Sequence, residues 1–199
     1  MTQYYYLVAS LPMLYFDGAP PFPSPAWLAM CREQVTADEA ALLSRVSFDT
    51  LACRSGDPAV WKTFSSWETA LRNELAAQRS QRLGLVPEPF LRPAPFIVGL
   101  PAVVKEALGA GTPLAVETAL DRRRWLCLDE LEAETQFDLG RLVVYRLKLL
   151  ILERRGRFRP EPGREKFRQE YARILDSAAS WAGAPVAAPS PMNAEKAND

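Results

Sequence analysis

Residues 129–159, DELEAETQFDLGRLVVYRLKLLILERRGRFR, form the stretch of sequence that decides the fold. Its middle, residues 139–152, is apolar at almost every angle of a helical wheel. A helix of that kind is either buried in a protein core or spans a membrane. The run falls short of the ~20 residues that a membrane span needs, and Arg141, Arg146 and Lys148 interrupt it. We therefore predict a long core helix that the rest of the chain covers, and no direct membrane insertion.

The two ends of this helix carry opposite charge. Its start follows five carboxylates, at Asp129, Glu130, Glu132, Glu134 and Asp138. Its end has four arginines, at Arg154, Arg155, Arg157 and Arg159. Both arrangements suit the helix dipole, by roughly 0.3–1 kcal/mol for each exposed charge. Gly156 is the predicted C-terminal stop.

Start signals for further helices recur along the chain. A serine, aspartate or threonine stands before a proline, as N-cap and first helical residue, at Ser24–Pro25, Asp57–Pro58 and Thr112–Pro113. Thr36 and Glu39 have the spacing of a capping box, which predicts another helix start. The helix after Asp57 is predicted to end at Gly84, and a short helix is expected over residues 101–108.

One segment leaves two interpretations open. Residues 4–10, YYYLVAS, are too few for periodicity to separate a short strand from one or two helical turns. No alternating strand pattern occurs elsewhere, so the predicted class is all-α: a helical bundle around the long buried helix. The last predicted helix, residues 164–181, has an apolar stripe formed by Phe167, Tyr171, Ile174 and Leu175.

The spacing of prolines suggests how these helices are grouped. Residues 87–100, PEPFLRPAPFIVGL, contain too many prolines for regular helix. We expect an N-terminal helical subdomain over residues 1–86, a proline-rich crossover over 87–100 and a C-terminal helical subdomain over 101–181. Residues 182–199, rich in alanine, proline and asparagine, are expected to be a disordered tail.

The composition indicates a cytoplasmic globular protein. The chain has 199 residues, 48% hydrophobic and 24% charged, which is enough to bury a core. Its net charge of zero gives no overall attraction to nucleic acid or to an anionic membrane. The first residues lack the pattern of a signal peptide. Cys31, Cys53 and Cys127 show no paired spacing, and we expect them to be buried, reduced thiols.

The residue types argue against catalysis. The chain has no histidine, which excludes Ser-His and Cys-His nucleophiles and removes the commonest metal ligand. Neither a P-loop nor a dinucleotide-binding glycine motif is present. The carboxylates of residues 129–138 could bind a divalent cation, although a solvated helix start is the commoner role for such a cluster. We expect no catalytic residue, no cofactor and no metal site.

Two groups of arginines are the candidate partner-binding residues: Arg122, Arg123, Arg124, Arg154, Arg155, Arg157 and Arg159. One interpretation makes them solvated helix ends that complement the helix dipole. The other makes them a surface for an acidic protein partner or a phosphate-bearing ligand. A pI near 6.4 and the lack of interleaved aromatic residues argue against nucleic acid as the partner.

Three segments resemble a bacterial family of uncharacterised proteins that is linked to V/A-type ATPase operons. They are YYYLVASLPMLYFD (residues 4–17), LDRRRWLCLDELEAETQFDLGRLVVYRLKLLILERRGRF (120–158) and GREKFRQEYARIL (163–175). The resemblance covers most of residues 1–180. In those operons the family holds the place of the central-stalk C (d) subunit, an all-helical, funnel-shaped adaptor between the rotor stalk and the membrane ring. The similarity to that subunit itself is looser, and it transfers no individual binding residue.

The resemblance implies a non-catalytic helical subunit or accessory protein of a V/A-type rotary ATPase, in the manner of the C (d) adaptor. Its partners would be subunits of the central stalk or of the membrane ring. It would be cytoplasmic, and peripheral at the inner membrane through the complex. The second hypothesis is a soluble regulatory binding protein whose arginine-rich face takes an acidic partner or ligand. An enzyme that uses carboxylates is the third hypothesis.

Overall fold

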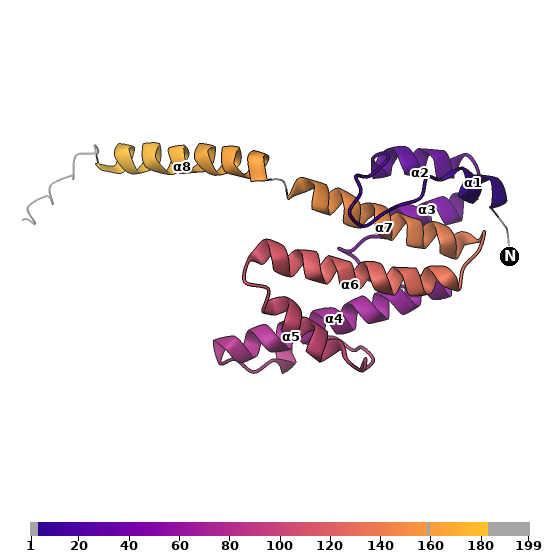
Figure 1. Cartoon of the computed structure of the whole chain (residues 1–199), viewed down its shortest axis with the longest axis horizontal. Coiled ribbons are helices and arrows are strands. Elements are labelled where there is room, and N and C mark those ends of the chain that lie inside the picture. The colour runs from indigo at the N-terminus through magenta and orange to yellow at the C-terminus, as the bar shows by residue number, and fades with distance from the viewer. Residues whose placement is uncertain (1–3, 159, 183–199) are drawn as a thin grey trace, which may run out of the picture. The chain divides into compact units, whose positions relative to one another are not determined.

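The computed structural model describes residues 4–158 and 160–182, which contain helices and no strand, so the all-α prediction is confirmed (Figure 1). The segment that left strand and helix open is helical. In chain order, the elements are α1 (Tyr5–Ser10), α2 (Ser24–Arg32), α3 (Ala37–Arg45), α4 (Ala59–Leu83), the 3₁₀ helix η1 (Glu88–Phe90), α5 (Leu100–Leu108), α6 (Pro113–Ala133), α7 (Leu139–Arg157) and α8 (Pro160–Ala182). Residues up to 158 form one compact unit, and α8 belongs to a second.

Helix α7 is the predicted core helix. Apart from Leu150, every residue from Leu142 to Leu152 is buried. In Figure 1, α7 lies between α6 on one side and the layer of α1, α2 and α3 on the other; α5 lies beyond α6, and α4 contacts both α6 and α7. Because α7 has neighbours on both sides, its sequence is apolar all round.

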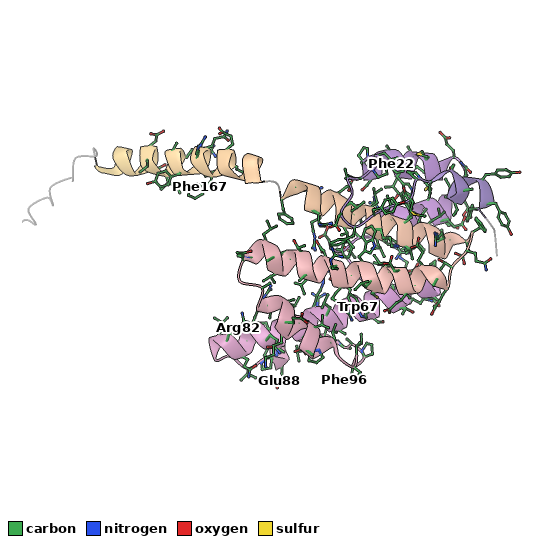
Figure 2. The ribbon with its side chains drawn as sticks, in the orientation of Figure 1. Phe22, Trp67, Arg82, Glu88, Phe96 and Phe167 are labelled. Carbon is green, nitrogen blue, oxygen red and sulfur yellow. The ribbon has the colours of Figure 1, made fainter. Side chains whose placement is uncertain are left out.

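Two hydrophobic clusters fill the compact unit. The larger joins α1, α2, α3 and α7 to the first half of α4 and the second half of α6. The smaller joins the second half of α4 to α5 and the first half of α6, and Trp67 packs against both clusters (Figure 2). Each cluster contains residues from both sides of segment 87–100. That segment therefore connects parts of one unit, and residues 1–86 do not have a core of their own.

The helix ends follow the predicted signals with some corrections. Gly84 ends α4 with a left-handed φ of 66°, as predicted, and Thr36 and Glu39 form the capping box. Thr112 caps α6 by accepting a hydrogen bond from the backbone N–H of Ala115 at 3.2 Å. The stop predicted at Gly156 is wrong, because α7 continues to Arg157 and Phe158 is the C-cap.

The N-cap roles predicted for Ser24 and Asp57 are wrong, because both side chains are engaged elsewhere. Ser24 is the first residue of α2 rather than its cap, and its backbone N–H donates to Glu153 Oε1 at 2.6 Å. Asp57 forms an ion pair with Arg45 at 2.6 Å. The Glu153 carboxylate thus accepts from both the N–H and the hydroxyl of Ser24, while Arg45 engages the Asp57 carboxylate, and α4 begins without a side-chain cap.

The N-terminal segment, residues 4–24, contacts residues 137–153, which are distant in sequence. Tyr4 donates a backbone hydrogen bond to Phe137 O at 2.5 Å, and the Tyr145 hydroxyl donates to Pro12 O at 3.1 Å. The Glu153 carboxylate lies at the N-terminus of α2, where the helix dipole favours a negative charge. Residues 4–24 are therefore held by side chains more than a hundred positions away in sequence.

The remaining predictions have mixed outcomes. Cys31 and Cys127 are buried, and burial raises the pKa of each thiol to about 12, but Cys53 is exposed, contrary to expectation. The helix predicted over residues 164–181 is present as α8. Except for Ala182, the last residue of α8, the tail predicted over residues 182–199 lies outside the described residues. Among the described helices, none combines the length and the apolar character needed to cross a membrane.

Candidate interaction surfaces

Arg124, predicted to meet a partner, is buried and bound within the chain. Its Nε lies 2.9 Å from Glu68 Oε2 and its Nη2 lies 3.1 Å from Glu68 Oε1, a two-pronged ion pair between α6 and α4. Its Nη1 donates to Asp121 Oδ1 at 3.1 Å. The Glu68 side chain is 0% exposed, so this carboxylate requires a cation beside it.

Arg154 and Arg72 complete a neutral group of six charges with Glu68, Arg124, Asp121 and Glu117. Arg154 reaches from α7 to Asp121 and lies 3.8 Å from Glu117. Burial lowers the pKa of Arg154, while the Glu117 carboxylate opposes that change. Three cations and three carboxylates balance, so the arginine-rich end of α7 uses this charge to hold α4, α6 and α7 together.

Arg122 and Arg155 hold the loop before α2. Both form ion pairs with Asp17, at 3.3 and 3.2 Å, and Arg155 also donates to Phe16 O. Their guanidinium carbons lie 4.4 and 3.8 Å from the centre of the Phe16 ring, and that ring meets Trp125 edge to face. Stacking and charge therefore fasten residues 16–17 onto α6 and α7.

The other candidate arginines form no common site with these. Arg123 is half-buried, and its Nε is buried with no hydrogen-bond partner among the described residues. Arg157 is exposed at the end of α7. Arg159 lies outside the described residues. The structure therefore separates the six described arginines into a buried network, a loop clamp and single side chains, and these six form no continuous basic face.

Three of the five carboxylates before α7, Asp129, Glu132 and Asp138, are bound within the chain. Asp138 caps α7 by accepting from the backbone N–H of Arg141 at 3.0 Å. Lys148, buried on α7, binds Asp129 at 2.6 Å and also binds Glu132. Among the described residues, no group of three or more such ligands is placed to hold a metal ion. The helix start expected for this cluster is wrong for Asp129, Glu130 and Glu132, because they lie in the last turns of α6 and only Asp138 stands directly before α7.

A cavity of about 500 Å³ lies beside these ion pairs, with Met13, Tyr15 and Phe137 among its apolar walls. Its charged lining residues are Asp129, Glu132, Arg141 and Lys148, and Arg141 binds Glu132 at 3.0 Å. The two cations and two carboxylates neutralise one another. The cavity therefore presents apolar walls and closed ion pairs, with no unpaired charge from these four residues to bind an ionic ligand.

One exposed apolar region of the compact unit covers the end of α4 and much of the predicted proline-rich crossover, residues 87–100. Between the end of α4 and the start of α5, seven large apolar side chains are 40–88% exposed. We call this region the α4–α5 surface: Leu83, Leu85, Val86, Phe90, Leu91, Phe96 and Val98. Figure 2 shows Arg82, Glu88 and Phe96 along one side of the unit. Large apolar side chains that are exposed in one segment are a common feature of sites of protein interaction.

The side chain of Asn73 on α4 holds the backbone of the α4–α5 surface at Arg92. The Asn73 side chain donates to Arg92 O at 2.6 Å and accepts from Arg92 N at 2.9 Å. Gly84 and Gly99, at either end of the segment, have left-handed φ values of 66° and 82°. A cavity of about 230 Å³ adjoins the α4–α5 surface, with Phe96 and Leu91 among its lining residues. An ordered apolar surface beside a small cavity can bind a protein side chain without first ordering a loop.

A sequence signal for this surface does exist. The closely spaced prolines of this segment exclude a regular α-helix. Between or just after them lie four large apolar residues, Phe90, Leu91, Phe96 and Val98. Apolar side chains on such a segment cannot be buried by helix packing, so they cover a neighbour or remain exposed. Only the three-dimensional structure distinguishes these outcomes.

Comparisons with known proteins gave no match: no protein-family model, no curated protein and no solved structure is detectably similar to the chain. The resemblance to the ATPase-linked family therefore stays a prediction.

Proposed function

We propose that the chain is a non-catalytic helical subunit or accessory protein of a V/A-type rotary ATPase. The observation that carries the proposal is the α4–α5 surface, seven exposed apolar side chains in a region that Asn73 ties to α4 through two hydrogen bonds. Such a surface buries itself against another protein. The resemblance of residues 4–17, 120–158 and 163–175 supplies the ATPase as that protein, with the central stalk or the membrane ring as the docking place.

The internal charge pairing supports a binding role over a catalytic one. The charged side chains beside the 500 Å³ cavity are engaged in ion pairs with one another, and burial raises the pKa of Tyr145, also in its lining, to about 12. A general acid or base works best with a pKa near the operating pH. We infer a cytoplasmic protein that is peripheral at the inner membrane through its complex, in the manner of a C (d) adaptor.

The alternative, a regulatory protein that binds an acidic ligand through an arginine-rich face, has less support. Arg124 is buried, and Arg122, Arg154 and Arg155 have carboxylate partners within the chain. An acidic ligand would have to displace these carboxylates. The alternative predicts steeply salt-dependent binding by the isolated protein, and its absence at low salt would count against it.

Copurification tests the proposal. A tagged full chain is expressed in its native cell, the rotary ATPase is purified through another subunit, and the chain is quantified in the complex. The expected result is stoichiometric recovery of the wild type and at least roughly tenfold lower recovery of Phe96→Asp/Val98→Asp, because aspartate cannot be buried without a partner. Met13→Asp, which places one such charge at an exposed apolar residue outside the surface, is the control and should be recovered normally.

Two results would contradict the proposal at different levels. Reproducible absence of the wild-type chain from the complex and from its assembly intermediates would refute the ATPase association. Normal recovery of the double variant would retain the association and refute the α4–α5 surface as the docking site. Circular dichroism of each purified variant confirms that it is folded.

A further inference from the structure

Helix α8, outside the compact unit, has an exposed apolar stripe. Phe167, Tyr171 and Ile174 are spaced by four and three residues, which places them on one face, and Leu175 lies beside them. Their exposed fractions are 71%, 54%, 64% and 51%. The Phe167 and Tyr171 rings stack with centroids 6.0 Å apart, so the stripe is continuous along the helix (Figure 2 labels Phe167). An amphipathic helix gains most of its stability from packing this face against something.

The two edges of the stripe carry opposite charges. At 100° per residue, Arg168 lies on one edge and Glu170 on the other. Both are more than half exposed, and each has a charge of opposite sign on the helix itself, Glu165 at 3.8 Å and Arg173 at 3.4 Å. Exposed pairs at these distances contribute little, so both charges remain available to a partner.

A second copy of this helix fits the stripe poorly. A self-standing coiled coil needs about three to four heptads, and Phe167, Tyr171 and Ile174 span only the beginning of a second. In a parallel pair, Glu170 would face Leu175 of the other copy; in an antiparallel pair, edges of the same kind would meet. Neither arrangement gives Arg168 and Glu170 partners of opposite charge.

A membrane surface also fits poorly. Between residues 165 and 176 the helix has three cations, Lys166, Arg168 and Arg173, and three carboxylates, Glu165, Glu170 and Asp176. Helices that lie in the membrane interface have polar faces rich in lysine and arginine, which anionic lipids attract. The charge of this helix sums to zero over the stripe, so that attraction is missing.

We propose that α8 docks as a helix into an apolar groove on a protein subunit of the rotary ATPase. The groove would have an acidic rim beside Arg168 and a basic rim beside Glu170, and its floor would receive Phe167, Tyr171 and Ile174. Anchors at such helical spacings are the signature of helix-in-groove recognition. The identity of the partner rests on the proposed function above, whereas the stripe and its edges rest on α8 alone. The chain would then have two separate docking elements.

The test uses the full chain and the purified ATPase complex in a binding titration. Tyr171→Asp/Ile174→Asp places two charges in the stripe and is expected to weaken binding at least tenfold, since anchor residues dominate interface energy. Gln169→Asp/Ala172→Asp adds the same charge to the opposite face and is expected to change affinity less than about threefold. Glu170→Arg, which reverses one edge, is expected to weaken binding measurably at low salt.

The other outcomes overturn the inference in distinguishable ways. If the stripe variant binds normally while Phe96→Asp/Val98→Asp binds weakly, α8 is not a docking helix and the proposed function stands. If the wild type does not bind at all, both proposals fall. A wild-type dimer in light scattering that the stripe variant abolishes would assign the stripe to a second copy, and stripe-dependent sedimentation with anionic vesicles would assign it to a membrane. Strong hydrogen-exchange protection of α8 in the free chain, unchanged on binding, would show that the stripe is already buried.

Discussion

Several charged residues of the compact unit form ion pairs that join one helix to another. Glu68 is fully buried and forms ion pairs with Arg124 and Arg72. Arg154 joins the same group because Asp121 pairs with both Arg124 and Arg154. A buried ion pair is not by itself strongly stabilising, because desolvation offsets the attraction. Removing one member is costly, however, because it leaves the other charged and buried.

The buried pair gives a first prediction. Arg124→Ala should lower the free energy of unfolding by about 3–5 kcal/mol, since Glu68 would lose both hydrogen bonds from that guanidinium. Urea denaturation followed by circular dichroism measures the change. Arg157→Ala, at an exposed arginine on the last turn of α7, should change the value by less than about 0.5 kcal/mol. Equal effects of the two substitutions would refute the internal role of Arg124.

Asp57 gives a prediction for acid pH. Its hydrogen bond from Arg45 holds the pKa of the Asp57 carboxyl below its usual value. A carboxyl with a lowered folded-state pKa stabilises the fold above its unfolded pKa of about 3.9, and this contribution is lost as the pH falls through the folded value. Asp57→Asn should therefore reduce stability at pH 7 and flatten the loss of stability between about pH 5 and pH 2. Urea midpoints across this range measure both effects. A parallel downward shift of the whole profile would exclude the linkage.

The arginines show where sequence reasoning ends. Adjacent residues on a helix point in different directions, and Arg122 and Arg124 reach different partners, Asp17 and Glu68. Those partners lie 105 and 56 positions away in sequence, so no local spacing reveals them. Local pattern located the charges, whereas the fold determined which of them would be buried.

At the scale of elements, α7 depends on a glycine at its start. A Cβ on Gly140 would lie 2.9 Å from Thr135 Cγ2, 3.1 Å from Asp138 Oδ1 and 3.3 Å from Val60 Cγ2. Two of these neighbours are side chains held in place, because Asp138 caps the helix and Thr135 donates to Glu132 O. The close packing of α7 against the turn before it and against α4 therefore requires glycine at this position.

Two substitutions within α7 give opposite predictions. Gly140→Ala should destabilise the protein by about 1–3 kcal/mol, because overpacking outweighs the higher helix propensity of alanine. Gly156→Ala, in the same helix with nothing within 4 Å of the added Cβ, should be neutral or stabilising by up to about 1 kcal/mol. Thermal or urea unfolding distinguishes them. A stabilising Gly140→Ala would mean that the start of α7 has room to relax.

The positions of the helices were largely predictable from the sequence. The partners and the exposure of individual side chains were less so. A capping box at Thr36, a proline after Thr112 and a glycine at position 84 are local signals, and the structure has a helix end at each. Ser24 and Asp57 carry the same signals, but long-range partners take their side chains. The exposure of Phe96 and Val98 depends on which neighbours surround segment 87–100, and that information is not local.

For the whole molecule, the core of the compact unit ends before α8. Every buried residue of both hydrophobic clusters lies between Tyr4 and Leu152. A chain that ends at Phe158 should therefore unfold cooperatively, with the urea midpoint of the full chain. A chain that ends at Glu134 lacks α7 and should show no cooperative transition, because the larger cluster loses its centre. Loss of cooperativity in the longer truncation would contradict the division into two units.

The contacts between residues 4–24 and α7 have a consequence for synthesis. Tyr145, Glu153 and Arg155 supply the hydrogen bonds that hold this first segment. On a ribosome that adds about 5–20 residues per second, the leading segment waits roughly 7–30 s for these residues to be made. During that interval its aromatic YYYLVAS sequence has no native place to bury itself. A chaperone acting at the ribosome exit should therefore contact the nascent chain at its first residues, and release it once α7 has emerged.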